Sequence, residues 1–121
     1  MTVRNETILI IEEDDDLRRL LSLALRMAGL PTREARDGLE AMAILEQLFP
    51  IDAVVLNVVL PDIDGLSIRQ EITARRGNIP VIVITDSPEP IPNLHPSCVV
   101  RKPVEPNDIV TAVVKCLRES V

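Results

Sequence analysis

The chain has 121 residues, of which 46% are hydrophobic, and a formal net charge of −6. This length suits one compact domain, and the acidic charge argues against nucleic-acid binding, which asks for a basic face. No apolar stretch approaches the roughly 20 residues that span a bilayer, and residues 1–6 lack the apolar segment of a signal peptide. We therefore expect a single cytoplasmic domain over residues 1–121, without membrane contact.

The first predicted elements are a strand and a helix. Residues 7–11 form a continuous run rich in isoleucine, which is typical of a strand buried on both faces. Asp15 or Asp16 is expected to cap a helix that ends at Gly29, because glycine is favoured just beyond a helix. Apolar residues follow helical spacing in this segment: Leu17, Leu20, Leu21, Ala24, Leu25 and Ala28.

A weak strand and a second helix are expected next. Residues 31–35 predict an edge strand, because a proline such as Pro31 is tolerated at the edge of a sheet. The Asp37-Gly38 turn then leads into a helix. Its apolar side is predicted to consist of Leu39, Met42, Ala43, Leu45 and Leu48.

The middle of the chain repeats the same alternation. Residues 53–56 are an apolar run that predicts a third, buried strand. A helix is expected over residues 65–75, with Leu66, Ile68 and Ile72 buried. Residues 79–85 predict the fourth strand. This alternation of strands and helices favours a parallel sheet with helices on both faces.

The segment 86–97 carries four prolines in twelve residues. In a helix interior each proline costs about 3 kcal/mol, so we expect a loop or a short helical turn. Residues 98–101 predict a fifth strand. A last helix should follow near Pro106, which suits a first turn, and bury a stripe of Ile109, Val110, Val113, Val114 and Leu117.

Polar residues stand at the ends of four predicted strands. Glu12 and Glu13 follow the first strand, Asn57 the third, Thr85 the fourth, and Lys102 the fifth. In a parallel sheet these ends face one crevice, where α/β folds place their functional groups. The sequence therefore predicts a site with two acids, a hydroxyl and an ammonium around a central amide.

The remaining residues with chemical potential give weaker signals. Cys98 and Cys116 show neither metal-like spacing nor a disulfide framework, so both are expected to be small core residues. His95 stands alone in the proline-rich segment and is expected to be inert.

Five segments in register resemble the receiver domain of two-component response regulators. They are residues 8–14, 35–41, 54–65, 79–85 and 101–103. The resemblance implies a flavodoxin-like, doubly wound, five-stranded parallel sheet of order 2-1-3-4-5. The family's fourth helix falls on residues 86–97, so here it should be shortened or replaced by a proline-rich loop.

The family transfers a phosphoryl group to an aspartate at the end of the third strand, and this position is Asn57. The resemblance places a divalent cation on Glu12, Glu13, the Asn57 position and the backbone carbonyl of Val59. An amide is a poor nucleophile and removes one negative ligand. Glutamates in place of the family's usual aspartates also lengthen each acid by one bond. A metal site here is therefore expected to be weak or lost.

The resemblance also assigns the phosphoryl pocket and the switch. The family's hydroxyl falls on Thr85, and its lysine falls on Lys102, joined to Pro103 by a cis peptide bond. Without a metal, Lys102 is expected to pair with Glu12 or Glu13. The aromatic switch residue of the family is replaced by Val99.

These departures predict a pseudo-receiver: a signalling module, not an enzyme, that works without phosphorylation. We expect it to bind a protein partner, either a sensor kinase or a downstream signalling protein, and no nucleic acid. No cofactor is expected, and Mg²⁺ only if the site functions.

Two alternatives remain open from the sequence. The chain could be a genuine phosphoacceptor in which Asn57 replaces an aspartate artificially, or in which Asp62, Asp64 or Asp86 takes the phosphate. A flavodoxin-like cofactor binder shares the topology. The absence of Trp and Tyr, which would sandwich a flavin ring, argues against that second alternative.

Overall fold

The computed structural model describes residues 7–47, 50–57, 65–86, 88 and 98–119, apart from the side chains of Leu66 and Glu119. These residues form strands β1 (Ile8–Ile11), β2 (Thr32–Ala35), β3 (Ala53–Asn57), β4 (Val81–Thr85) and β5 (Val99–Arg101). The helices are α1 (Asp15–Met27), α2 (Gly38–Glu46), α3 (Gly65–Arg76) and α4 (Pro106–Glu119). No helix among the described residues is both long enough and apolar enough to cross a membrane.

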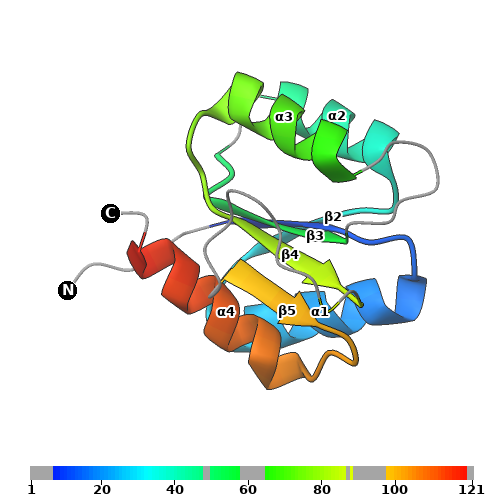
Figure 1. Ribbon diagram of the computed structural model, residues 1–121, viewed down its shortest axis with the longest axis vertical. Helices are drawn as coiled ribbons and strands as arrows, with labels where there is room; N and C mark the ends of the chain where they lie inside the picture. Colours follow the sequence, from blue (N-terminus) through cyan, green and yellow to red (C-terminus); the bar gives the residue numbers. More distant parts are fainter. Residues whose placement is uncertain (1–6, 48–49, 58–64, 87, 89–97, 120–121) are drawn as a thin grey trace.

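The five strands form one parallel sheet in the order β2-β1-β3-β4-β5, which confirms the predicted topology (Figure 1). All residues of β1 and β3 are buried. A parallel sheet is covered by helices on both faces, so its central strands read as continuous apolar runs rather than as alternating patterns.

Helices cover the two faces of the sheet in pairs (Figure 1). On one face, α1 and α4 pack over Ile8 and Ile10, and on the other α2 and α3 pack over Leu9 and Ile11. Successive side chains of a strand point to opposite faces, so β1 supplies residues to both cores. The carboxyl ends of the strands are left at one edge, between the two helical layers.

The boundaries of α1 agree with the sequence except at its cap. Asp14, rather than Asp15 or Asp16, caps the helix, and its carboxylate accepts a hydrogen bond from the Leu17 N–H at 3.0 Å. An N-cap side chain reaches the N–H two or three residues on, so Asp14 is the acid with the right spacing. Gly29, with φ of 87°, follows the helix as predicted.

Some predicted apolar faces were wrong. Leu20 is 43% exposed and Leu39 is 69% exposed, and Ala28 and Ala43 are also exposed. Leu21 and Leu25 of α1 and Leu45 of α2 are buried as predicted, but the buried faces also contain Arg18 and Ser22 in α1 and Gly38 and Ala41 in α2. Small or polar residues occupy part of the inward face of each helix. A prediction from apolar residues alone therefore placed that face on the wrong side by part of a turn. Leu48 lies outside the described residues.

The last helix begins at Pro106 as predicted and buries Ile109 and Val113. Val110, Val114 and Leu117 are partly buried against the same core. Of the segment 86–97, only Asp86 and Pro88 are described. The predicted replacement of a helix in that segment therefore stays a prediction.

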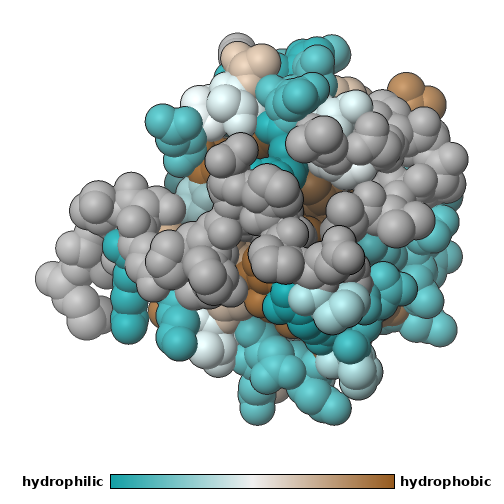
Figure 2. Space-filling model, viewed as in Figure 1, coloured by the Kyte–Doolittle hydropathy of each residue, from teal (hydrophilic) through white to brown (hydrophobic). Residues whose placement is uncertain are grey.

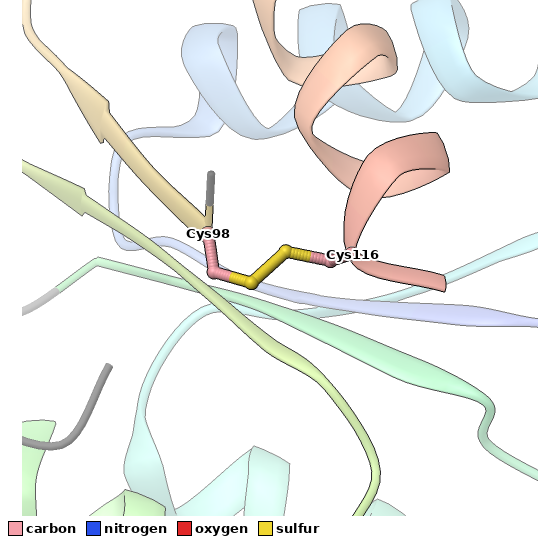
Figure 3. The surroundings of a disulfide bond; sticks show 2 residues. All are labelled: Cys98 and Cys116. Atoms are coloured by element: carbon pink, nitrogen blue, oxygen red, sulfur yellow. A yellow bond between two sulfur atoms is a disulfide. The ribbon is translucent and has the colours of Figure 1, made fainter. Parts of the chain in front are cut away.

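The prediction for the two cysteines was wrong in one respect. Both are buried in the core, but Cys98 and Cys116 also form a disulfide (Figure 3). Their Cα atoms are 5.8 Å apart, which is within the usual range for a disulfide. The sheet topology brings residues 18 positions apart together, and a spacing with no motif could not indicate this.

Candidate functional site

Three polar side chains are buried at the carboxyl edge of the sheet. Glu12 directly follows β1, Asn57 ends β3 and Thr85 ends β4. Their exposed fractions are 2%, 5% and 7%. Buried polar groups need hydrogen-bond partners, because desolvation without compensation is costly. Their contacts therefore define what the site can bind.

Glu12 and Asn57 are bonded directly to each other. The Asn57 amide donates from Nδ2 to Glu12 Oε1 at 3.0 Å and to Oε2 at 3.2 Å. The Asp14 backbone N–H also donates to Glu12 Oε2, at 3.0 Å. Each hydrogen bond to a charged group contributes about 1.5–3 kcal/mol. The amide therefore complements the buried carboxylate, whereas a second carboxylate at this position would repel it.

Arg18, which was not among the predicted site residues, is bonded to the backbone of the acidic turn. It is 6% exposed, and its Nη1 donates to the Glu12 carbonyl at 2.9 Å. The same guanidinium contacts Glu34 of β2 at 3.2 Å and Asp15 at 2.5 Å. The pKa of Asp15 lies below its ordinary value. The largest cause is the hydrogen bond from Arg18, and the second is the positive charge of Arg18. Arg18 thus fixes the backbone from which the Glu12 side chain extends.

The pattern of α1 contained a signal for Arg18. It lies three residues before Leu21 and seven before Leu25, so it shares their inward face. An arginine at such a position must have partners, because a buried charge is otherwise costly. Glu34 is its partner from the neighbouring strand.

Lys102 does not complete the site as expected. Its backbone N–H donates to the Thr85 carbonyl at 2.9 Å, and the predicted cis bond to Pro103 is confirmed. However, Lys102 is exposed, and in the part of the chain that the structure describes it forms no ion pair with Glu12 or Glu13. Both Glu12 oxygens already accept N–H donors, which removes the need for an ammonium partner.

The other predicted residues are more peripheral. Glu13 and Asp86 are exposed, and Val99 is partly buried. Val59, Asp62, Asp64 and His95 lie outside the described residues.

The described residues do not fit a divalent cation. Mg²⁺ binds oxygen ligands in near-ideal octahedral geometry, but the Glu12 carboxylate here faces N–H groups of Asn57 and Asp14. Glu13 is exposed, and the described part of the chain holds no group of three or more His, Cys, Asp or Glu that could bind a metal. The amide hydrogen bonds occupy the place where a metal would need free carboxylate oxygens.

Sequence comparison identifies the family. A family model described as "Response regulator receiver domain" matches residues 8–114. The chain is 38% identical over 80 residues to the DNA-binding dual master transcriptional regulator RpaA of Synechocystis, covering 64% of the chain and 33% of RpaA. It is 28% identical over 125 residues to the DNA-binding response regulator MtrA of Mycolicibacterium smegmatis, covering 99% of the chain and 54% of MtrA. The chain thus spans about a third to a half of these relatives.

Solved structures show the same fold. A CheY-like response regulator receiver domain from Methanospirillum hungatei matches with a TM-score of 0.82 at 20% identity, covering 97% of both chains. The receiver domain of the hybrid histidine kinase CckA matches with a TM-score of 0.78 at 28% identity, covering 92% of this chain and 98% of that one. Both superpose on this chain over more than nine-tenths of its length.

Proposed function

The chain belongs to the response-regulator receiver family of two-component signalling, and we propose that it signals without accepting a phosphoryl group. The observation that carries this proposal is the Asn57 amide, hydrogen-bonded to the buried Glu12 carboxylate. The family's acceptor aspartate falls on this position. An acyl phosphate forms on a carboxylate oxygen, and a neutral amide is too poor a nucleophile to take its place.

The contacts around Asn57 also support the loss of the cation site, in addition to the loss of the nucleophile. In an active receiver, the acids after the first strand bind a cation that neutralises the phosphoryl charge. Here Glu12 is held by N–H donors, and Arg18 fixes its backbone. We infer that this hydrogen-bonded pair replaces the metal as the stabilising element of the crevice. The site then serves as a fixed structural core rather than a chemical centre.

We propose that the output is protein binding. The relatives RpaA and MtrA are DNA-binding regulators, and the chain covers only part of their length. The net charge of −6 does not favour direct contact with DNA. A kinase or an effector domain is therefore the expected class of partner, and any DNA contact would belong to another domain.

The decisive experiment combines a small phosphodonor with intact-mass measurement. Wild type and Asn57→Asp are incubated with acetyl phosphate and Mg²⁺, and a known active receiver serves as the positive control. We expect no mass gain in the wild type. A gain of one phosphate in the wild type would overturn the proposal, and peptide mapping would then show whether Asp62, Asp64 or Asp86 had accepted it.

The Asn57→Asp variant separates two kinds of silencing. If Asn57 alone blocks an intact phosphorylation site, this variant gains phosphate and changes its partner binding or oligomeric state. We expect no such activation, because Glu12 and Glu13 in place of aspartates and Val99 in place of the switch aromatic remain. Phosphodonor-dependent activation of the single variant would favour an artificially or recently silenced receiver.

A further inference from the structure

The Cys98–Cys116 disulfide joins the residue just before β5 to the last turns of α4 (Figure 3). We propose that it is a reversible redox latch, opened by a dithiol reductant and closed by a disulfide oxidant. The latch is a property of β5 and α4 and does not depend on the proposal for Asn57. It would give the domain an input that requires no phosphoryl chemistry.

The fold does not need this bond as a staple. Disulfides are usually required for folding only in domains below about 40 residues, which cannot build a sufficient core. This domain has an extensive apolar core on each face of its sheet. Ile109, Ala112 and Val113 bury the middle of α4 without help from the cysteines. Reduction should therefore leave the domain folded.

The reduced state is also compatible with the core around the two cysteines. Cys98 and Cys116 belong to the apolar cluster between the sheet and the α1–α4 layer. A free cysteine behaves as a small hydrophobic residue, so two thiols can remain buried there. Reduction removes only the covalent link, which attaches the last turns of α4 to the residue before β5. Reduction thus loosens one end of one helix rather than the whole domain.

The exchange chemistry balances with a dithiol as the reductant. Cys98 is 8% exposed and Cys116 is 1% exposed, so an external thiolate attacks the Cys98 sulfur. The protein S–S bond breaks, and Cys116 leaves as a thiolate that takes a proton. The second thiol of the reductant then resolves the mixed disulfide. The protein gains two electrons and two protons, and the dithiol becomes a disulfide.

Alkylation in redox buffers tests reversibility. The native chain is equilibrated at pH 7 with graded ratios of reduced to oxidised dithiothreitol, then quenched, alkylated and weighed by mass spectrometry. We expect a shift between zero and two alkylated thiols as the ratio changes, reached from both directions. A bond that persists in the fully reduced buffer would show a permanent staple and overturn the proposal. Two free thiols in the fully oxidised buffer would overturn it as well.

Hydrogen exchange tests whether the bond acts as a latch on α4. On reduction, we expect amides in the second half of α4 to exchange about tenfold faster or more. Helix α2, on the opposite face of the sheet, serves as the internal control and should change less than α4. Unchanged exchange in α4 would show that the disulfide does not stabilise this helix and would overturn the proposal.

A matched variant separates reduction from other effects of the reagent. The melting temperature of the native chain should fall by about 10 °C on reduction. A disulfide stabilises a protein because the loop that it closes limits the conformations of the unfolded chain. The double variant Cys98→Ala/Cys116→Ala should melt at one temperature with or without dithiothreitol. An equal response of the double variant would assign the change to the reagent and contradict the latch.

Discussion

Asn57 and Glu12 are mutual hydrogen-bond partners at the ends of two neighbouring strands, with both oxygens of the buried carboxylate within 3.2 Å of the Asn57 amide nitrogen. Each residue supplies what the other lacks. The carboxylate needs donors because it is removed from water, and the amide donates without adding charge. The position thus favours asparagine for stability, which agrees with the proposal that the domain accepts no phosphoryl group.

Replacing Asn57 by Asp should destabilise the domain at neutral pH in the absence of metal. Two buried carboxylates would then face each other, and their mutual repulsion would oppose folding while both are charged. We expect a loss of about 2 kcal/mol at pH 7 that shrinks in acid, where protonation removes the repulsion. Urea unfolding at several pH values measures it. The exchanged pair Glu12→Gln/Asn57→Asp should recover most of the stability, and a fully stable single variant would contradict the coupling.

Magnesium should bind the wild type weakly. The Glu12 oxygens accept three N–H contacts, and breaking them opposes coordination. We expect no saturable binding of Mg²⁺ or Mn²⁺ below about 1 mM, the weak end of carboxylate sites. Titration calorimetry provides the measurement. Asn57→Asp should bind more tightly than the wild type, because it adds an anionic ligand. Submillimolar affinity of the wild type would show that the hydrogen-bonded pair does not block the site.

Arg18 should matter far more than its neighbour Arg19. Arg18→Met leaves the buried Glu12 carbonyl without its donor and removes the partner of Glu34, so we expect a loss of about 2 kcal/mol. Arg19 is exposed, so Arg19→Met, the matched control in the same helix, should change the free energy of unfolding by less than about 0.5 kcal/mol. Equal effects of the two substitutions would mean that Arg18 does not position the acidic turn.

The pair of Asp15 and Arg18 should give a pH-dependent contribution. Arg18 lowers the pKa of Asp15 in the folded state, so the stabilisation is present above the unfolded pKa of about 3.9 and is lost as the pH falls through the folded value. Asp15→Asn should therefore be less stable than the wild type at pH 7, and the difference should shrink in acid. Asp16→Asn, the exposed neighbour, is the control. A difference between wild type and Asp15→Asn that does not depend on pH would contradict this assignment.

The centre of the sheet could be predicted because β1 and β3 are continuous buried runs bounded by turn residues. Residues 7–11 and 53–56 needed no knowledge of distant contacts, since burial on both faces leaves a continuous pattern in the sequence. The convergence of Glu12 and Asn57 followed from topology alone, because strand ends of a parallel sheet share one edge. Their direct bond, however, depends on rotamers that a sequence pattern does not specify.

Three features that escaped prediction depend on contacts between different elements of the fold. Arg18 is buried because Glu34 of β2 lies beside it, and Cys98 meets Cys116 only after β5 and α4 have packed. The exposure of Leu39 depends on which side of α2 faces the sheet. Periodicity describes one helix at a time, so it could place Arg18 on the inward face of α1 but could not identify its partner, the disulfide or the side of α2 that faces the sheet.

The packing of α1 against α4 brings residues 15–27 together with residues 106–119, far along the chain. During synthesis, Ile8, Ile10 and the inward face of α1 leave the ribosome long before residues 106–119 exist. A nascent chain therefore carries an uncovered apolar surface until its last helix is complete, and such surfaces are prone to aggregation. A truncation before Pro106 should accordingly yield an insoluble product, whereas a domain fused after α4 leaves the core intact.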